Sequence, residues 1–174
     1  IGGAGGNWRR IDEKFDASIV KQTSGISCVS AVGEMLLFNR GLVVPQAKIR
    51  DIIGEPAEFG SLARALNEFD KATDDGGMAM INDDDQSLDT LFRQKNWAVI
   101  LCEPLTMGHA VIVGGRTSTG LVKIKDPLDQ TSYKMARADF LAHRGGQVIC
   151  DGFLNDQIKH PESVSGRCQP RRSA

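Results

Sequence analysis

The hydrophobic pattern of the chain changes near its middle, and this change restricts the fold more than any other feature. In the first half, good helix formers carry apolar residues at helical spacing in the segments 28–40, 43–54, 61–72 and 87–96. From Trp97 onward, the apolar runs are short, rich in β-branched residues and separated by turn residues. Helices in one half and strands in the other predict an α+β domain, in which an N-terminal helical half packs on a C-terminal antiparallel sheet.

Residues that start or stop helices set the expected boundaries. Gly41 and Gly54 stand where helices end, and Pro45 stands near a first turn. Ser61 and Ser87 are the expected N-caps of the two following helices. Strands are expected at 97–103, 109–115, 121–127, 131–135 and 147–154, with a possible edge strand at 78–82 and a short helix or turn at 137–146.

The predicted domain occupies residues 18–154, between two segments of different composition. Residues 1–17 open with IGGAGG and are interpreted as a Gly-rich linker and lead-in, in which Ile11 and Phe15 are spaced for one turn of helix. Residues 155–174 are polar and contain prolines, which is typical of a poorly ordered tail. Because the chain starts with Ile rather than Met, we expect a domain of a longer polypeptide.

Composition excludes several classes of function. The 174 residues are 41% hydrophobic and 25% charged, as in an ordinary soluble globular protein. A formal net charge of −1 gives no reason to expect nucleic acid or an acidic membrane surface as a partner. No apolar run approaches the roughly 18 residues of a membrane span, and no signal segment stands at the start.

Cys28 is the candidate nucleophile, because it stands at the first turn of the first predicted helix. The positive end of the helix dipole and the free backbone N–H groups there favour a thiolate. Six positions earlier, the side-chain amide of Gln22 could donate, together with the N–H of Cys28, to an oxygen that develops negative charge. The alternative is that Cys28 is inert packing, since cysteine is among the residues most often buried.

The candidate base and its partner come from the second half. His109 follows a glycine and opens the run HAVIVGG, and Asp126 ends the run LVKIKDP. If the two runs pair as an antiparallel hairpin, the carboxylate lies beside the imidazole and orients it toward the thiol. Asp129 is the rival for the orienting role. His143 and His160 are the rival bases, and both stand in polar surroundings typical of surface histidines.

These motifs resemble those of the papain-like cysteine peptidases. The strongest matches are QTSGISC, GHAVIVGG and IKDP, and in element order the resemblance covers residues 18–150. The most similar branch removes double-glycine leaders from bacteriocins. The resemblance implies that Cys28 is the nucleophile, His109 the general base and acid, Asp126 the residue that orients His109, and Gln22 an oxyanion-hole donor.

The flanks of the cysteine depart from that branch. Its members usually have Asp before the cysteine and Gly after it, whereas Ser27 and Val29 stand here. The sequence also resembles papain-fold toxin domains at the ends of large bacterial secreted proteins, some of which are glutamine deamidases. The substrate class is therefore less defined than the fold.

Three functions remain open at this stage. The first is a thiol hydrolase that cleaves peptide or amide bonds of a protein or peptide through a Cys-His-Asp acyl-enzyme mechanism. It is expected to be the effector or toxin domain of a secreted bacterial protein, to act in the cytoplasm of a target cell, and to have a cognate immunity protein. The second is a glutamine deamidase toxin. The third is a papain-like scaffold that binds a peptide or partner without catalysis.

Cysteine and histidine spacing predicts neither a metal site nor a cofactor. Cys102 and Cys150 are expected to be buried thiols, and Cys168 to be exposed or paired with Cys150, with reduced thiols as the preferred state. The three histidines are too widely spaced for a zinc site. The acidic run 83–85 lacks the alternating ligands, glycine and terminal glutamate of a calcium loop.

Overall fold

The computed structural model describes residues 7–70, 78–82, 88–103 and 108–151. This part of the chain contains five helices and seven strands. The helices are α1 (Cys28–Asn39), α2 (Gln46–Ile53), α3 (Phe59–Phe69), α4 (Leu88–Leu91) and α5 (Arg137–His143). The strands are β1 (Ile11–Phe15), β2 (Met78–Asn82), β3 (Trp97–Leu101), β4 (His109–Arg116), β5 (Val122–Asp126), β6 (Thr131–Met135) and β7 (Arg144–Asp151).

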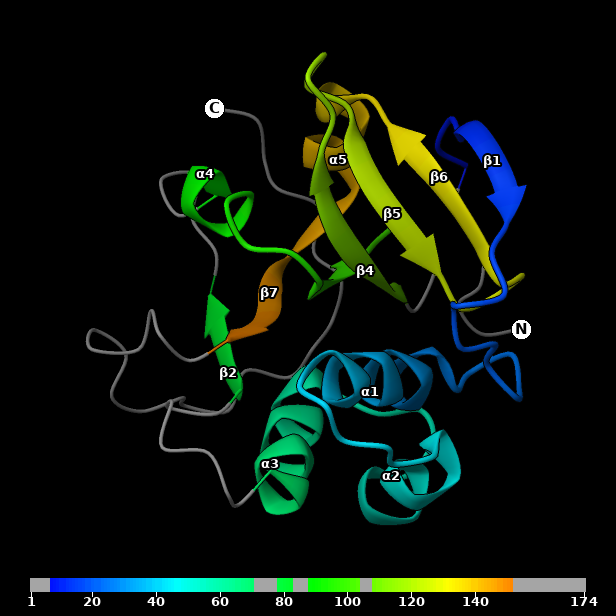
Figure 1. Cartoon of the computed structure of the whole chain (residues 1–174), viewed down its shortest axis with the longest axis vertical. Helices are drawn as coiled ribbons and strands as arrows, with labels where there is room; N and C mark the ends of the chain where they lie inside the picture. Colours follow the sequence, from blue (N-terminus) through cyan, green and yellow to red (C-terminus); the bar gives the residue numbers. More distant parts are fainter. Residues whose placement is uncertain (1–6, 71–77, 83–87, 104–107, 152–174) are drawn as a thin grey trace.

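The strands form one antiparallel sheet, in the order β1-β6-β5-β4-β3-β7-β2. The predicted hairpin exists, since β4 pairs with β5 in a register that sets Ile112 opposite Lys125. The expected edge strand at 78–82 also exists, as β2. Figure 1 shows α1, α2 and α3 grouped together beside the sheet, with α5 at the opposite side. This arrangement is the α+β architecture that the sequence predicts.

Each central strand is apolar on both faces because each face of the sheet carries its own core. One core joins α1–α3 to the sheet, and its strand residues are Ala98, Ala110, Ile112 and Ile149. The other core contains α4, α5 and Trp8, and its central-strand residues include Val99, Val111, Val113 and Val148. Because successive strand residues point to opposite faces, β3 and β4 form continuous apolar runs rather than alternating ones.

Close packing of the three N-terminal helices fixes α1 against the sheet. Gly33 lies in the middle of α1, and a Cβ atom at this position would stand 2.7 Å from Leu62 Cδ1 and 3.2 Å from Ile49 Cδ1. Leu62 and Ile49 are fully buried and come from α3 and α2. The absence of a side chain at residue 33 therefore lets α2 and α3 approach α1.

The prediction of a helical turn at Ile11 and Phe15 is wrong, since both residues belong to strand β1. The strand pairs with β6 at the edge of the sheet, and Phe15 is 67% exposed. Residues four apart share a face of a strand as well as of a helix, so their spacing could not distinguish the two structures. The domain boundaries remain a prediction, but the sheet includes a strand from the expected lead-in.

Three further boundaries differ from expectation. α3 begins at Phe59 after Glu58, and Ser61 is therefore inside the helix rather than its N-cap. α4 ends at Leu91 rather than near 96, and Asn96 has a positive φ of 61° immediately before β3. β7 follows α5 without an intervening loop, at Arg144. The expected cap at Ser87, the acidic run 83–85 and the tail 155–174 lie outside the described residues.

Cys28 and Cys150 are buried thiols, whereas Cys102 is disulfide-bonded. The prediction of a reduced, buried thiol is therefore wrong for Cys102. Cys102 is only partly buried and lies just beyond the end of β3. The apolar run WAVILC predicts a position inside the sheet, but the strand ends one residue earlier. Cys168 lies outside the described residues. Among the described helices, none combines the length and apolar character that a membrane crossing requires.

Candidate active site

Cys28 is the first residue of α1 and is nearly buried, with 7% of its surface exposed. Buried residues on the helix pack against the sheet, and the Cys28 side chain interacts with His109, the first residue of β4. The backbone N–H groups of a first helical turn have no partners within the helix. Cys28 therefore lies at a position where an anionic sulfur or oxygen is stabilised.

His109 and Asp126 form a buried pair between neighbouring strands. His109 begins β4 and Asp126 ends β5, and the hairpin brings His109 Nε2 within 2.6 Å of Asp126 Oδ1. Only 2% of the surface of His109 and none of that of Asp126 is exposed. The predicted pairing of these two residues is therefore present in the structure.

The second ring nitrogen of His109, Nδ1, is not used by Asp126, and it is the nitrogen left for the thiol. His109 Nδ1 is buried and has no hydrogen-bond partner of ordinary geometry among the described residues. The Cys28 side chain nevertheless interacts with the ring, and this interaction contributes to the raised pKa of His109. The structure thus brings together three of the predicted site residues in the order Cys28, His109, Asp126.

The electrostatics of the pair favour a charged imidazole. Burial has the largest influence on His109 and lowers its pKa, but hydrogen bonds to Asp126 and Cys28 and the charges of both residues outweigh it and raise the pKa to about 9. Burial likewise opposes ionisation of Asp126, whose pKa is nevertheless lowered by its bonds to His109, the Leu128 N–H and Tyr133. Both pKa shifts favour the charged forms, an imidazolium next to a carboxylate.

Gln22 lies in the loop before α1, as predicted, but its amide is engaged within the loop. Its Nε2 donates to the Ser24 carbonyl at 2.7 Å, and its Oε1 is buried without a partner among the described residues. Its backbone N–H donates to the Pro127 carbonyl at 2.8 Å, which ties the loop to the end of β5. Gln22 is therefore attached to both halves of the site, while its oxyanion role remains a prediction.

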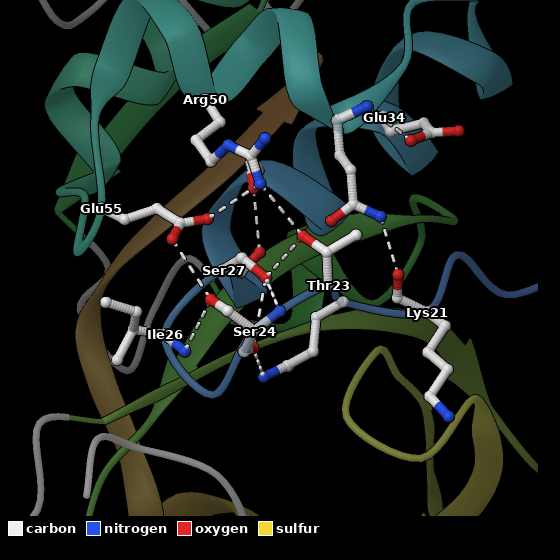
Figure 2. A network of polar contacts seen from close by, with 11 residues as sticks. Lys21, Thr23, Ser24, Ile26, Ser27, Glu34, Arg50 and Glu55 are labelled. Carbon is white, nitrogen blue, oxygen red and sulfur yellow. Dashed lines mark hydrogen bonds and ion pairs between the residues drawn. The ribbon is translucent and has the colours of Figure 1, made fainter.

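A polar network holds the loop 21–27 against α2 (Figure 2). Arg50 Nη1 donates to Thr23 Oγ1 at 3.2 Å and lies 3.7 Å from Glu55 Oε1. Glu55 Oε2 accepts from Ser24 Oγ at 3.2 Å. Gln46 Nε2 donates to the Lys21 carbonyl at 2.7 Å. These contacts attach the loop to α2 and to Glu55 just beyond it.

Ser27 forms hydrogen bonds within the loop that precedes Cys28. Ser27 Oγ accepts from the Ser24 N–H at 2.9 Å and lies 3.2 Å from the Ser24 carbonyl, to which it donates. The same hydroxyl lies 3.4 Å from Thr23 Oγ1. Ser27 therefore stabilises the turn that leads into Cys28.

The rival residues lie elsewhere. Asp129 is exposed in the turn after β5. His143 Nδ1 bonds to the Asp139 carbonyl at 2.8 Å, and its Nε2 is 4.0 Å from Glu103, so the ring is engaged within its own helix and the loop after β3. His160 lies outside the described residues. No cluster that could hold a metal ion is found in the described part of the chain.

Sequence reasoning missed two residues that support Asp126. Tyr133 Oη donates to Asp126 Oδ2 at 3.0 Å, and Trp8 Nε1 donates to Tyr133 Oη at 3.1 Å. The only signal for Tyr133 was its place in the strand TSYKM, where it shares a face with Met135. Trp8 is 125 positions away from Tyr133 and gave no sequence signal for this contact.

Solved structures with a similar fold include peptidase domains. The peptidase domain of Streptococcus ComA, a bifunctional ABC transporter of a quorum-sensing pathway, matches with a TM-score of 0.64 and 18% identity over 75% of this chain and 94% of that domain. A double-glycine-motif protease from an AMS/PCAT transporter, solved with its leader peptide, matches with a TM-score of 0.58 and 16% identity over 80% of this chain and 91% of that one. The chain therefore has the papain-like fold of cysteine peptidases, as its motifs predict.

A curated relative has a more specific name. Cysteine protease effector 1 of Escherichia coli O1:K1:H7 is 35% identical to this chain over 141 residues, which are 80% of this chain. The chain spans 28% of the length of that relative. No protein-family model matches the chain.

Proposed function

We propose that this domain is a cysteine peptidase that acts through a Cys28-His109-Asp126 triad. The observation that carries the proposal is the buried His109–Asp126 pair at 2.6 Å, whose imidazole interacts with a cysteine at a helix N-terminus. A scaffold that only binds partners needs neither a buried ion pair nor a thiol beside it. The name of the Escherichia coli relative and the peptidase domains of the same fold support the same activity.

The proposed reaction passes through a thioester. The thiolate of Cys28 attacks the carbonyl carbon, while the Cys28 N–H and Gln22 donate to the oxyanion. The C–N bond then breaks, and the imidazolium of His109 gives its proton to the leaving amine. Water adds to the thioester with His109 as base, which releases the carboxylic acid and restores the thiol. Asp126 keeps the ring of His109 aligned in both steps.

Reactivity of the thiol tests the site without knowledge of the substrate. Iodoacetamide labelling, followed by peptide mapping, compares Cys28 with Cys150, which is also a buried thiol. A catalytic Cys28 reacts much faster than Cys150 at neutral pH, and His109→Ala removes the difference. Equal rates in the wild-type protein would instead support a scaffold without catalysis.

The proposed substrate is a peptide segment of a protein. The AMS/PCAT protease of similar fold was solved in complex with the leader peptide, which supports a peptide substrate. Treatment of a bacterial lysate with wild-type protein and with Cys28→Ala, followed by mass spectrometry, identifies the reaction. New chain termini that require Cys28 indicate peptide cleavage, whereas a mass increase of about one dalton at glutamine indicates the alternative, deamidation, which uses the same acyl-enzyme chemistry.

The proposed biological role is that of a toxic effector delivered into a target cell. The name of the curated relative, a cysteine protease effector, favours this role. Expression of the domain in bacterial cytoplasm should arrest growth, and Cys28→Ala should abolish the arrest. Growth that is unaffected by the wild-type domain would count against the role. A cognate inhibitor protein would be identified as a protein whose co-expression restores growth.

A further inference from the structure

The carboxylate of Asp126 is held from behind by a tyrosine and a tryptophan that the triad does not include. Asp126 Oδ1 accepts from His109 Nε2 and from the Leu128 N–H, the latter at 2.9 Å. Asp126 Oδ2 accepts from Tyr133 Oη at 3.0 Å, and Tyr133 Oη accepts from Trp8 Nε1 at 3.1 Å. The contact thus extends from the triad through β6 to the segment before β1.

The chemistry of the two rings fixes the direction of these bonds. An indole N–H can only donate, so the tyrosine oxygen is the acceptor in its contact with Trp8. The single hydroxyl proton of Tyr133 is then available to Asp126. Burial, followed by the charge of Asp126, raises the pKa of Tyr133, which keeps the phenol protonated. Tyr133 is therefore an obligatory donor to the carboxylate.

The surroundings allow little other freedom. Trp8 is 6% exposed and Tyr133 is 2% exposed. The rings of Trp8 and His143 meet edge to face, with centroids 5.5 Å apart. The charged groups that face the phenol are Asp126 from β5 and Arg10 from the segment before β1, whose guanidinium stands 5.1 Å from the ring centroid and pairs with Glu13 at 2.8 Å. The Arg10 guanidinium lies over the face of the Tyr133 ring. The partners of the hydroxyl are Asp126 and Trp8.

We propose that Tyr133 is a positioning residue of the active site and that Trp8 aims its hydroxyl at Asp126. A carboxylate held through one oxygen can turn about its Cβ–Cγ bond and carry the imidazole out of line with the thiol. A donor on the second oxygen prevents this rotation. This inference rests on the proposed function, and it assigns a catalytic contribution to a residue outside the predicted domain boundary of 18–154.

The readout is the rate at which iodoacetamide alkylates Cys28 at pH 7, because this rate depends on alignment of His109 and requires no substrate. Tyr133→Phe keeps the ring and removes the donor, and should slow alkylation about tenfold, the order expected when a hydrogen bond to a charged group is lost. Trp8→Phe keeps the Tyr133 hydroxyl but removes the indole N–H that orients it. This variant should slow alkylation about threefold. In the double variant, Trp8→Phe should add nothing, because both changes act through one bond.

A structural role is separated from a positioning role by a matched control. Met135 is fully buried on the same face of β6, and Met135→Leu perturbs that core without touching Asp126. It should leave the alkylation rate of Cys28 at the wild-type value, while thermal unfolding reports the stability of every variant. With peptidase substrate in hand, Tyr133→Phe should lower kcat and leave KM unchanged.

Three outcomes decide the inference. Alkylation that is as fast or faster in folded Tyr133→Phe would overturn it, and so would independent, multiplicative effects of Trp8→Phe and Tyr133→Phe. A slower rate in Met135→Leu, in proportion to its loss of stability, would also overturn it. Failure of the proposed function looks different, since Cys28 of the wild-type protein would then react no faster than Cys150.

Discussion

At the residue scale, the site depends on keeping one imidazole charged inside the protein. Burial alone would strip His109 of its proton, and Asp126 reverses this effect from 2.6 Å away. The thiolate–imidazolium pair that the proposed chemistry requires is therefore a property of three residues together. Changing Asp126 or Cys28 alters the pKa of His109, because both residues contribute to its shift.

Asp126→Asn should reduce peptidase kcat about a hundredfold, within the range ascribed to general acid–base groups. Without the carboxylate, burial dominates and the pKa of His109 falls below about 9. The alkaline limb of the pH–rate profile, where the imidazolium is lost, should therefore move to lower pH. Asp129→Asn is the control, since Asp129 is exposed in the adjoining turn. Equal activity of the two variants would remove Asp126 from the triad.

Gln22→Ala should lower kcat about a hundredfold if the amide serves the oxyanion. Gln46 is the matched control, because it is also nearly buried and also donates to a carbonyl of the loop, that of Lys21 at 2.7 Å. Both substitutions should cost similar stability, measured by urea unfolding. A loss of kcat that is equal in Gln46→Ala would mean that Gln22 only shapes the loop.

At the scale of elements, the site forms where the N-terminus of α1 meets the start of β4 and the end of β5. Each half contributes what its secondary structure provides: the helix end supplies unpaired N–H groups, and the hairpin supplies two side chains in fixed register. The loop 21–27 joins them, with the Gln22 N–H on Pro127 at one side and Arg50 at the other. The contacts of α2 with this loop therefore support the segment that carries Gln22, to which we assign an oxyanion role.

Arg50→Met should lower kcat/KM severalfold while changing stability by less than about 1 kcal/mol, because the Arg50 side chain is 37% exposed and its ion pair with Glu55 is screened. The loss of its bond to Thr23 should loosen the loop that carries Gln22. Arg64→Met on α3 is the control, since Arg64 bonds only within its own helix, to Ser61 at 3.4 Å, in the contacts described here. Peptidase assays and thermal unfolding would be compared, and identical kinetics for both variants would contradict the role.

At the scale of the whole molecule, the features that could be predicted from the sequence are those set by residues close together in the chain. The runs HAVIVGG and LVKIKDP are separated only by the short turn segment 116–120, so the hairpin and the His109–Asp126 pairing could be predicted from local patterns. The helix that starts at Cys28 has a clear beginning and end for the same reason. The meeting of Cys28 with His109 required, in addition, the resemblance to a known fold.

The residues that the sequence could not reveal depend on contacts between distant segments. β1 is a strand because β6 offers it an unpaired edge, and nothing within residues 11–15 specifies that edge. Trp8 and Tyr133 are 125 positions apart and come into contact only in the core that forms when the sheet assembles. Loop boundaries such as the early start of α3 are decided by packing rather than by a capping residue.

Stability of the whole domain should fall as pH rises from about 6.5 to 9. The pKa of His109 is about 9 in the folded protein and about 6.5 in an unfolded chain, so the folded state binds the proton more tightly. Its contribution is complete below pH 6.5 and is lost as pH passes 9. At about 1.4 kcal/mol per pKa unit, a shift of this size corresponds to a loss of roughly 3–4 kcal/mol. Urea unfolding at fixed ionic strength measures this loss.

His109→Gln should flatten the dependence of stability on pH, whereas His143→Gln should retain it. A wild-type slope that persists in His109→Gln would show that the pH dependence comes from another group.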